Sequence, residues 1–455
     1  MTKLYSNSDQ RLFGTDGIRG TVNAGKVTAL TAVNLAMAAG EYFYGKAGTK
    51  KSRVLIGKDT RLSGYMLEPA LVAGFTSVGL DSITTGPLPT PAIAHLTRVL
   101  RCDLGVMISA SHNPYEDNGL KLFGADGFKL NDEVENQIQL RMEKGPTLAK
   151  SELLGRARRM EDAIGRYSEF VKQILPKHQD LNGMKVVLDC ANGASYKVGP
   201  EVLLELGAES IVIGVEPNGR NINLDCGAMF PNKMANTTKL EEADLGIALD
   251  GDADRVIFSD ENGDIIHGDQ IIALLAKEMK INNELSNDKV VGTLMSNLGL
   301  ENFLLKDLGI KLKRSPVGDI NVIEDMKKNK SFLGGEQSGH IILSDFSKTG
   351  DGILAALKIT EIMSIIKKSS SSIFDLYDNL PQIKVNISYK KISEKTKKNI
   401  KDLNKKNRRY KKIRVLIRLS GTEPLIRLLV EGQDLKIVQQ KAKNLELEIR
   451  NIIGQ

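Results

Sequence analysis

Cysteine is scarce in this sequence, with three residues in a chain of 455. Cys102, Cys190 and Cys226 are too few and too widely separated to form a disulfide framework or a zinc site. We therefore expect reduced thiols and a cytoplasmic protein. The sequence also lacks an uninterrupted apolar run long enough to cross a bilayer, and residues 1–10 are polar, without the apolar core of a signal peptide. These absences argue against a secreted or membrane protein and against a membrane partner.

Acidic residues are scarce in one segment of the chain. The whole chain has a net charge of +7, but residues 390–418 hold fourteen Lys or Arg residues and only two acidic ones. Such a basic block can bind nucleic acid, yet this one contains a single aromatic residue, Tyr410, and no recognisable nucleic-acid module. We interpret it as a solvated surface. A further interpretation is that its positive field attracts phosphate esters. We expect no nucleic-acid partner.

The sequence is rich in short apolar runs that alternate with amphipathic stretches. Five runs of Val, Ile and Leu predict buried strands, at residues 53–57, 105–109, 185–189, 245–250 and 290–294. Helical patterns lie before, between or after them, at residues 28–44, 196–206, 268–280 and 352–367. The pattern then changes to two strands near 383–389 and 413–419 and a final helix at 435–452. This alternation predicts α/β domains with mostly parallel strands, and the length suits about three domains.

A small polar turn, SASHNP at residues 109–114, follows one of the predicted strands and contains Ser111. The carboxyl end of a strand is where ligands gather in α/β sheets. Beside His112, Ser111 suggests a nucleophile and its base, although most loop serines are only turn formers. Hydrolase-type Ser–His catalysis also needs an acid that orients the His, and a sequence neighbour rarely supplies that geometry. Taken alone, this segment favours a structural turn.

A cluster of carboxylates follows the predicted strand at 245–250. Asp250, Asp252 and Asp254 alternate on a Gly-containing turn, where they would repel each other unless a cation held them. Oxygen ligands suit magnesium or calcium. A calcium EF-hand would use the same three aspartates and Glu261 at its twelfth position, but Arg255 stands where that loop requires Gly. The flanking segments are also strand-like, so the sequence favours a magnesium site whose open position takes a phosphate oxygen.

Two further segments carry residue types found in ligand sites. Residues 334–340 (GGEQSGH) combine closely spaced glycines with Glu336 and Ser338, which either bond sugar hydroxyls or face water in a plain turn. Residues 418–427 (RLSGTEPLIR) hold a Ser-Gly-Thr turn between two arginines. Hydroxyls, turn N–H groups and guanidinium forks match the oxygens of a phosphate monoester. A surface turn with solvated arginines is the alternative, and the glycine between two hydroxyls favours phosphate.

Five segments together match the motifs of a known family in the family's order. They are GTDGIRG at 14–20, ISASHNP at 108–114, DGDADR at 250–255, GGEQSGH at 334–340 and SGTEPLIR at 420–427. With these motifs the sequence resembles the α-D-phosphohexomutase family over nearly the whole chain. Five ordered motifs make a chance match improbable.

The resemblance implies an α/β fold of three similar domains with mixed, mostly parallel sheets, and a smaller α+β C-terminal domain, around a central cleft. On this basis the first domain, with the phosphoserine loop, is expected at residues 1–155, and the second, with the metal loop, at 156–255. The third, with the sugar-binding loop, is expected at 256–370, and the C-terminal domain, with the phosphate-binding loop, at 371–455. The sequence does not give the oligomeric state, and a homodimer is the working expectation.

The resemblance also implies a role for each motif residue. Ser111 matches the family's phosphoserine, whose phosphate joins Asp250, Asp252 and Asp254 as a magnesium ligand. Residues that match groups near the transferred phosphate, or groups proposed to move protons, are Lys121, Arg19 and His340. Residues that match the substrate site are Glu336, Gln337, Ser338 and Arg255. Residues that match the distal phosphate site are Arg418, Ser420, Gly421, Thr422 and Arg427.

The activity implied by the resemblance is the interconversion of glucosamine 6-phosphate and glucosamine 1-phosphate. It uses Mg²⁺, a phosphoserine enzyme and a sugar bisphosphate as intermediate and activator. Gln337 resembles the glucosamine branch, whereas phosphomannomutases and phosphoglucomutases, the alternatives within the family, usually differ there. A phosphosugar phosphatase and a non-catalytic phosphosugar binder are alternatives from other classes. One departure is Ile320 in VGDIN (residues 317–321), where the family usually reads VGDRY with Arg.

Overall fold

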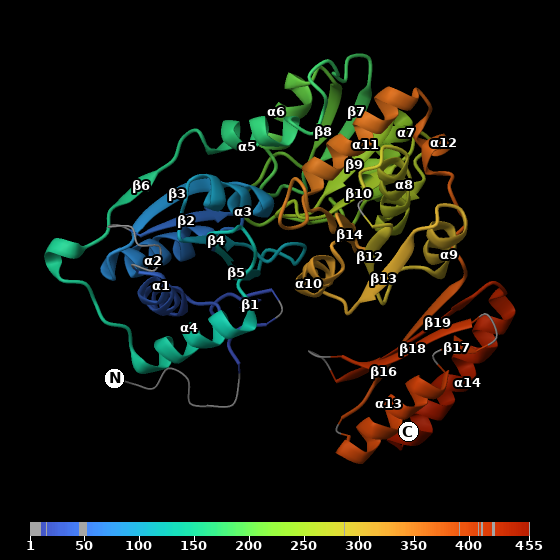
Figure 1. Ribbon diagram of the computed structural model, residues 1–455. Helices are drawn as coiled ribbons and strands as arrows, with labels where there is room; N and C mark the ends of the chain where they lie inside the picture. The colour runs from blue at the N-terminus through green and yellow to red at the C-terminus, as the bar shows by residue number, and fades with distance from the viewer. Residues whose placement is uncertain are drawn as a thin grey trace.

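The computed structural model describes residues 11–14, 16–44, 52–285, 287–390, 392–407, 409–410, 413–420 and 424–454. The strands of these residues form four sheets, and each sheet with its helices makes one unit of the molecule (Figure 1). The first unit is blue in Figure 1, the second green, the third yellow to orange, and the fourth red.

The first unit has a six-stranded sheet. Its strands, in spatial order, are β1 (Ile18–Thr21), β5 (Asp117–Gly124), β4 (Leu104–Ile108), β2 (Arg53–Lys58), β3 (Asp81–Pro87) and β6 (Ala157–Arg159). Its helices are α1 (Ala29–Phe43), α2 (Gly64–Ser77), α3 (Thr90–Val99) and α4 (Asp132–Lys144). Helix α1 begins where the sequence predicts, because the Thr28 side chain accepts a hydrogen bond from the N–H of Thr31.

The second and third units have smaller sheets. The second sheet runs β11 (Ile265–Ile266), β10 (Val256–Ser259), β9 (Leu245–Leu249), β7 (Lys185–Asp189) and β8 (Glu209–Ile213). The third runs β13 (Lys311–Ser315), β12 (Lys289–Thr293), β14 (Leu333–Gly335) and β15 (Ile341–Leu343). The helices along this part of the chain are α5 (Ala163–Lys172), α6 (Val198–Glu205), α7 (Asn232–Leu240), α8 (Gly268–Ile281), α9 (Leu298–Lys306), α10 (Asp319–Asn329), α11 (Gly352–Ile366) and α12 (Ser370–Phe374).

The fourth unit is a smaller antiparallel sheet with two helices. The sheet runs β16 (Gln382–Ser388), β19 (Leu425–Gly432), β18 (Ile413–Leu419) and β17 (Arg409–Tyr410). The helices are α13 (Glu394–Asn407) and α14 (Leu435–Ile453). Six of the fourteen basic residues of the block are lysines of α13, whose buried residues are Ile400, Leu403 and Asn407. Its lysines therefore lie mainly on the solvent side, which agrees with a solvated surface.

The three α/β sheets repeat one strand order. The orders β3-β2-β4-β5, β8-β7-β9-β10 and β13-β12-β14-β15 each join three parallel strands to a fourth, antiparallel one. This repetition, with the smaller α+β unit, confirms the predicted fold class. The apolar runs and helical patterns of the sequence all became elements, with ends within about two residues of those predicted.

Two predicted domain boundaries fall inside a sheet. Strand β6, which follows the boundary at residue 155, pairs with β3 of the first sheet. Strands β10 and β11 follow the boundary at 255, yet β10 pairs with β9 of the second sheet, because the turn of the metal loop folds the chain straight back. The first and second sheets thus extend beyond residues 155 and 255.

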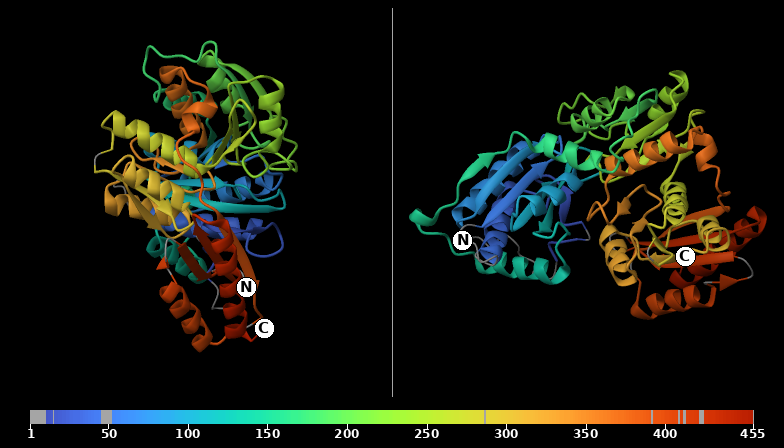
Figure 2. Two further views of the ribbon diagram at one scale, coloured as in Figure 1. Left: turned by 90° about the vertical axis from the view of Figure 1, so that its right-hand side faces the viewer. Right: turned by 45° about the horizontal axis from the view of Figure 1, so that its top comes forward.

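The apolar core is continuous through the first three units and separate in the fourth. One cluster joins residues such as Leu55 of the first sheet, Val186 of the second and Leu274 of the third unit. The fourth unit has its own cluster around Val415, Leu428 and Val438. Figure 2 shows the fourth unit set at the edge of the other three. All three cysteines are buried free thiols, and none of the helices in the described part of the chain is long and apolar enough to cross a membrane.

Candidate active site

Three of the predicted functional loops occupy the same place in the repeated strand order. The loop with Ser111 joins β4 to β5, the aspartate loop joins β9 to β10, and residues 336–340 join β14 to β15. In each unit this loop lies at the carboxyl end of a parallel strand and leads into the antiparallel strand. The three loops are therefore equivalent parts of the repeat, and their side chains meet between the units.

Ser111 points into the aspartate loop of the second unit. Its hydroxyl donates to Asp250 Oδ2 at 2.6 Å, and its side chain is nearly fully buried. The Ser111 backbone has φ +50°, in the left-handed region that non-glycine residues rarely adopt. Its N–H donates to Ser109 Oγ at 2.9 Å. Strain of this kind persists only where the surroundings hold it, and it clusters at functional sites.

A buried arginine that the motif analysis did not assign holds the Ser111 loop. Arg61 Nη2 donates to the carbonyls of Ser111 at 2.9 Å and Asn113 at 2.8 Å. Its Nε donates to Asp59 Oδ2 at 2.8 Å, and Asp59 also accepts from the Ser109 hydroxyl. From the second unit, Asn223 Nδ2 donates to the Ser111 carbonyl at 2.9 Å. The available signal for Arg61 was its glycine-rich segment, GKDTRLSG at 57–64.

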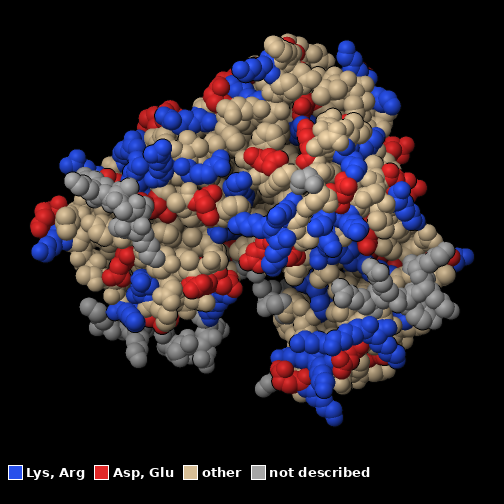
Figure 3. Space-filling view, viewed as in Figure 1, with Lys and Arg blue, Asp and Glu red and all other residues tan. Residues whose placement is uncertain are grey.

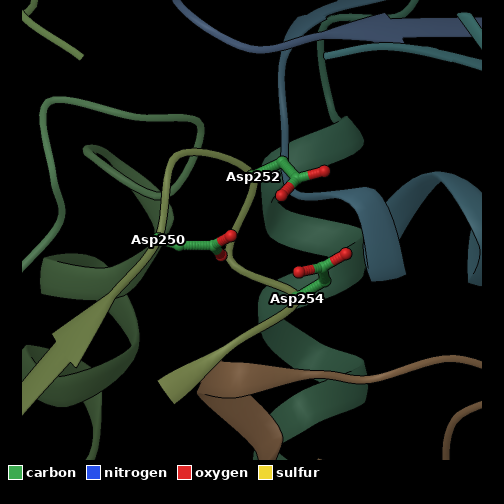
Figure 4. A group of neighbouring side chains, drawn as sticks. All are labelled: Asp250, Asp252 and Asp254. Carbon is green, nitrogen blue, oxygen red and sulfur yellow. The ribbon is translucent and has the colours of Figure 1, made fainter. Parts of the chain in front are cut away.

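The three aspartates form a compact buried group that can hold a metal ion. One carboxylate oxygen of each lies within 4.8 Å of the others, and Figure 4 shows the carboxylates around one small space. Burial and the charges of Asp254 and Asp252 raise the pKa of Asp250 to about 8. Asp252 Oδ1 and Asp254 Oδ1 are buried and have no hydrogen-bond donor among the described residues. Crowded, unpaired carboxylate oxygens fit a hard divalent cation.

Two basic side chains of the first unit contact the aspartate group and the turn that carries Ser111. Lys121 Nζ lies 2.8 Å from Asp252 Oδ2, 3.5 Å from Asp254 Oδ2 and 3.3 Å from Asp16 Oδ2. Burial disfavours the charge of Lys121, but these three carboxylates hold its pKa well above the usual range. Arg19 donates to the Ala110 carbonyl and, at 2.7 Å, to Asn113 Oδ1. Lys121 thus lies against the aspartate group, and Arg19 lies against the Ser111 loop.

His340, on the loop between β14 and β15, approaches the aspartate group at Asp254. Its Nδ1 is 3.7 Å from Asp254 Oδ1, and its Nε2 accepts the N–H of Gly350 at 3.1 Å. A ring nitrogen that accepts carries no hydrogen, so this contact assigns the hydrogen of a neutral His340 to Nδ1, facing Asp254. In this arrangement the acceptor nitrogen of His340, Nε2, is already occupied by the hydrogen bond from the Gly350 N–H.

The predicted substrate residues divide into two groups. Glu336 accepts from the Gly318 N–H at 2.9 Å and from the Ser338 hydroxyl at 3.3 Å, which fixes its carboxylate. Arg255 Nε lies 3.9 Å from Asp254 Oδ1, beside the metal group. Gln337 instead accepts from Lys384 Nζ of the fourth unit at 3.2 Å. Gln337 is therefore engaged with the fourth unit, whereas the others stay with the three central loops.

The predicted distal phosphate residues lie on the fourth unit. Arg418 and Arg427 are directly opposite each other on β18 and β19. Burial and the charge of Arg427 lower the pKa of Arg418. Like charges at this spacing repel each other, and an anion between them would remove that cost. Ser420 N–H donates to the Leu425 carbonyl at 2.8 Å, and Gly421 and Thr422 lie outside the described residues.

The structure thus brings together most of the predicted site. Side chains of the first three units meet around the aspartate group, namely Ser111, Lys121, Arg255 and His340, and Arg19 contacts the turn that carries Ser111. The arginine pair is on the fourth unit, whose core is separate. Figure 3 shows an open notch between the first and fourth units. The site therefore combines a group of adjoining loops with a separate sheet that carries the arginine pair.

Comparison with known proteins matches every unit. Models of the phosphoglucomutase/phosphomannomutase α/β/α domains I, II and III match residues 10–148, 165–263 and 267–382, and the C-terminal domain model matches 382–447. The phosphoglucosamine mutase of Parvibaculum lavamentivorans is 54% identical over 446 residues, covering 97% of this chain and 99% of that protein. That of Rhodospirillum rubrum is 50% identical over 442 residues, covering 94% and 96%.

The solved structures agree at the level of the fold. A phosphoglucomutase/phosphomannomutase family protein of Burkholderia thailandensis superposes with a TM-score of 0.82 at 20% identity, over 97% of each chain. Fold and site together define a four-domain protein of the phosphohexomutase class. The chain belongs to the phosphoglucomutase/phosphomannomutase family, which confirms the resemblance in its motifs.

Proposed function

We propose that this protein is a phosphoglucosamine mutase, an isomerase that interconverts glucosamine 6-phosphate and glucosamine 1-phosphate. The observation that carries the proposal is the Ser111 hydroxyl, held 2.6 Å from Asp250 inside the buried aspartate group. Relatives that are 50–54% identical over nearly their whole length bear this name, and Gln337 stands in the GEQSGH segment typical of the glucosamine branch.

Phosphorylated Ser111 would start the reaction. Its phosphoryl group passes to the 1-hydroxyl of glucosamine 6-phosphate and gives the bisphosphate, and the hydroxyl loses its proton. The bisphosphate turns end for end, and its 6-phosphate returns to Ser111. Because this transfer needs mainly alignment and charge stabilisation, rigid support of the serine loop by Arg61 and Asn223 is a direct contribution to catalysis.

Charge stabilisation is the second requirement. We infer that Asp250, Asp252 and Asp254 hold magnesium, which, when bound, supplies positive charge against the transferred phosphoryl oxygens. Lys121 and Arg19 add fixed charge from the first unit. Of the two candidates for the proton acceptor, Lys121 is held in its charged form by its three carboxylates, which leaves His340. His340 must first exchange its contact with Gly350 for one with the sugar.

For the bisphosphate to turn end for end, the protein needs a phosphate-binding site that accepts either end of the molecule. Arg418 and Arg427, with Ser420, Gly421 and Thr422, suit this role because a phosphate monoester presents the same oxygens at both ends. Glu336 and Ser338 are the proposed contacts to the sugar hydroxyls. The sugar bisphosphate is then both intermediate and activator.

Two broader expectations belong with this proposal. The three buried free thiols suit the reducing cytoplasm. The homodimer and the domain bounds between the units stay predictions.

A substrate panel tests the proposed function. We expect glucosamine 6-phosphate, with catalytic bisphosphate and Mg²⁺, to exceed glucose and mannose 6-phosphates in kcat/KM by at least about tenfold, because a polar site rejects analogues that lack its partner group. Product formation without Mg²⁺ should be negligible. Equal or greater turnover of mannose 6-phosphate would contradict the specificity, and steady release of inorganic phosphate would indicate a phosphatase.

A further inference from the structure

The turn that follows β5 crosses from the first unit to the third. Phe128 in this turn packs against an apolar cluster of the third unit, which consists of Val291, Val322, Ile323, Met326 and Ile342. Lys327 Nζ of α10 lies 3.3 Å from the centre of the Phe128 ring. Gly127 has φ +80°, and a side chain there would come within 2.8 Å of the Ala94 carbonyl. The turn therefore packs closely between α3 and the third unit.

Lys129, the next residue, makes an ionic contact across the same junction. Its buried side chain pairs with Asp319, the first residue of α10, and with Asp16 of the first unit. Burial alone would lower the pKa of Lys129, but Asp16 and Asp319 raise it. In Figure 1, α10 is on the side of the third unit that faces the first unit. Phe128 and Lys129 thus supply an apolar and an ionic contact to one helix.

Asp319 directly follows Gly318, whose backbone N–H supports Glu336 of the sugar-binding loop. The Gly318 N–H donates to Glu336 Oε1 at 2.9 Å. On its other side, Asp16 contacts Lys121, which contacts Asp252 of the metal group. Alternating charges therefore connect the support of Glu336 with the metal loop through Lys129. A shift of Lys129 would change the distance between the proposed sugar contact and the reacting groups.

We propose that Lys129 and Asp319 are positioning residues that set Glu336 at its working distance from the phosphoserine and metal loops. They touch neither the sugar nor the phosphate and act through Gly318 and Glu336. This inference rests on the proposed function. Its consequence is that sugar binding depends on an ionic contact between the first and third units.

The test uses full-length K129M, D319N and the double variant. Met keeps the length of Lys129, and the side-chain oxygen of the amide in D319N can still accept the Ile320 N–H that Asp319 Oδ1 accepts at 2.8 Å. We expect each single variant to raise KM for glucosamine 6-phosphate about tenfold, with kcat changed less than about threefold, because displaced binding groups weaken substrate positioning. In the K129M background, D319N should raise KM by less than about a further twofold, because the contact between the two residues is already lost. The matched control K172M removes ion pairs with Glu169 and Glu205 in the second unit, remote from the junction, and should keep the wild-type KM.

Three results would overturn the inference. The first is a wild-type KM in both single variants while the wild-type enzyme is active. The second is full additivity of the two effects, which would show that the residues act separately. The third is a fall in kcat and unfolding temperature with KM unchanged, which a purely structural role predicts. An inactive wild-type enzyme would instead count against the proposed function itself, and the inference would fall with it.

Discussion

Replacing Ser111 with Ala is expected to abolish turnover, with kcat falling on the order of 10⁴-fold or more. The variant has no hydroxyl to carry the phosphoryl group, and no neighbouring side chain takes the place of the hydroxyl that lies 2.6 Å from Asp250. The fold should persist, because Ser111 already adopts the left-handed backbone and its carbonyl contacts to Arg61 and Asn223 remain. Steady-state kinetics and the intact mass of the purified protein are the measurements.

A matched control is S77A. Ser77 lies at the end of α2 in the same unit, and its hydroxyl contacts only the Gly74 carbonyl of its own helix among the described residues. It should keep wild-type kinetics and the phosphorylated mass. Substantial activity in S111A, or an unchanged phosphorylated fraction, would mean that another residue carries the phosphate.

Replacing Asp252 with Asn should raise the Mg²⁺ concentration for half-maximal activity more than about 100-fold, since even outer-shell changes cost roughly 10- to 100-fold in metal affinity. Asp252 is fully buried, and its Oδ1 has no donor in the described part of the chain. A magnesium titration of activity at fixed substrate measures the effect. D162N, at an exposed pair with Arg166 in α5, is the control.

The same titration has an expected pH dependence in the wild-type enzyme. Burial, Asp254 and Asp252 raise the pKa of Asp250 to about 8 when no cation is bound. A proton on Asp250 therefore competes with the metal below that pH, and apparent Mg²⁺ affinity should rise from about pH 7 to about pH 8.5.

For D252N, an unchanged Mg²⁺ concentration for half-maximal activity would show that Asp252 is not part of the metal site.

Much of the fold followed from local pattern. The strands β2, β4, β7, β9 and β12 were predictable because buried parallel strands are continuous runs of Val, Ile and Leu. The boundary at 155 fell inside a sheet because β6 is only three residues long, without a readable period, and pairs with β3 much earlier in the chain. The boundary at 255 fell between β9 and β10, which pair across the aspartate loop, because the end of that motif does not mark the end of the sheet.

The site was predictable as separate loops but not as an assembly. Ser111 and Asp250 are distinctive in sequence, yet only the structure shows their contact between the first and second units. Arg61 was hidden because its function is to bond three carbonyls of the serine turn. Gln337 was predicted at the substrate, whereas its side-chain oxygen meets Lys384. Such contacts between units are set by tertiary geometry, which a motif does not encode.

The most direct test follows labelled phosphate from Ser111. Enzyme carrying a labelled phosphate on this residue is mixed with unlabelled glucosamine 6-phosphate and Mg²⁺, and the products are separated after a single turnover. The mutase account predicts that the label leaves Ser111 for the sugar, first in the bisphosphate and then in sugar monophosphate, with little inorganic phosphate. Label that is released as inorganic phosphate at the turnover rate, or that stays on Ser111 while glucosamine 1-phosphate forms, would contradict it.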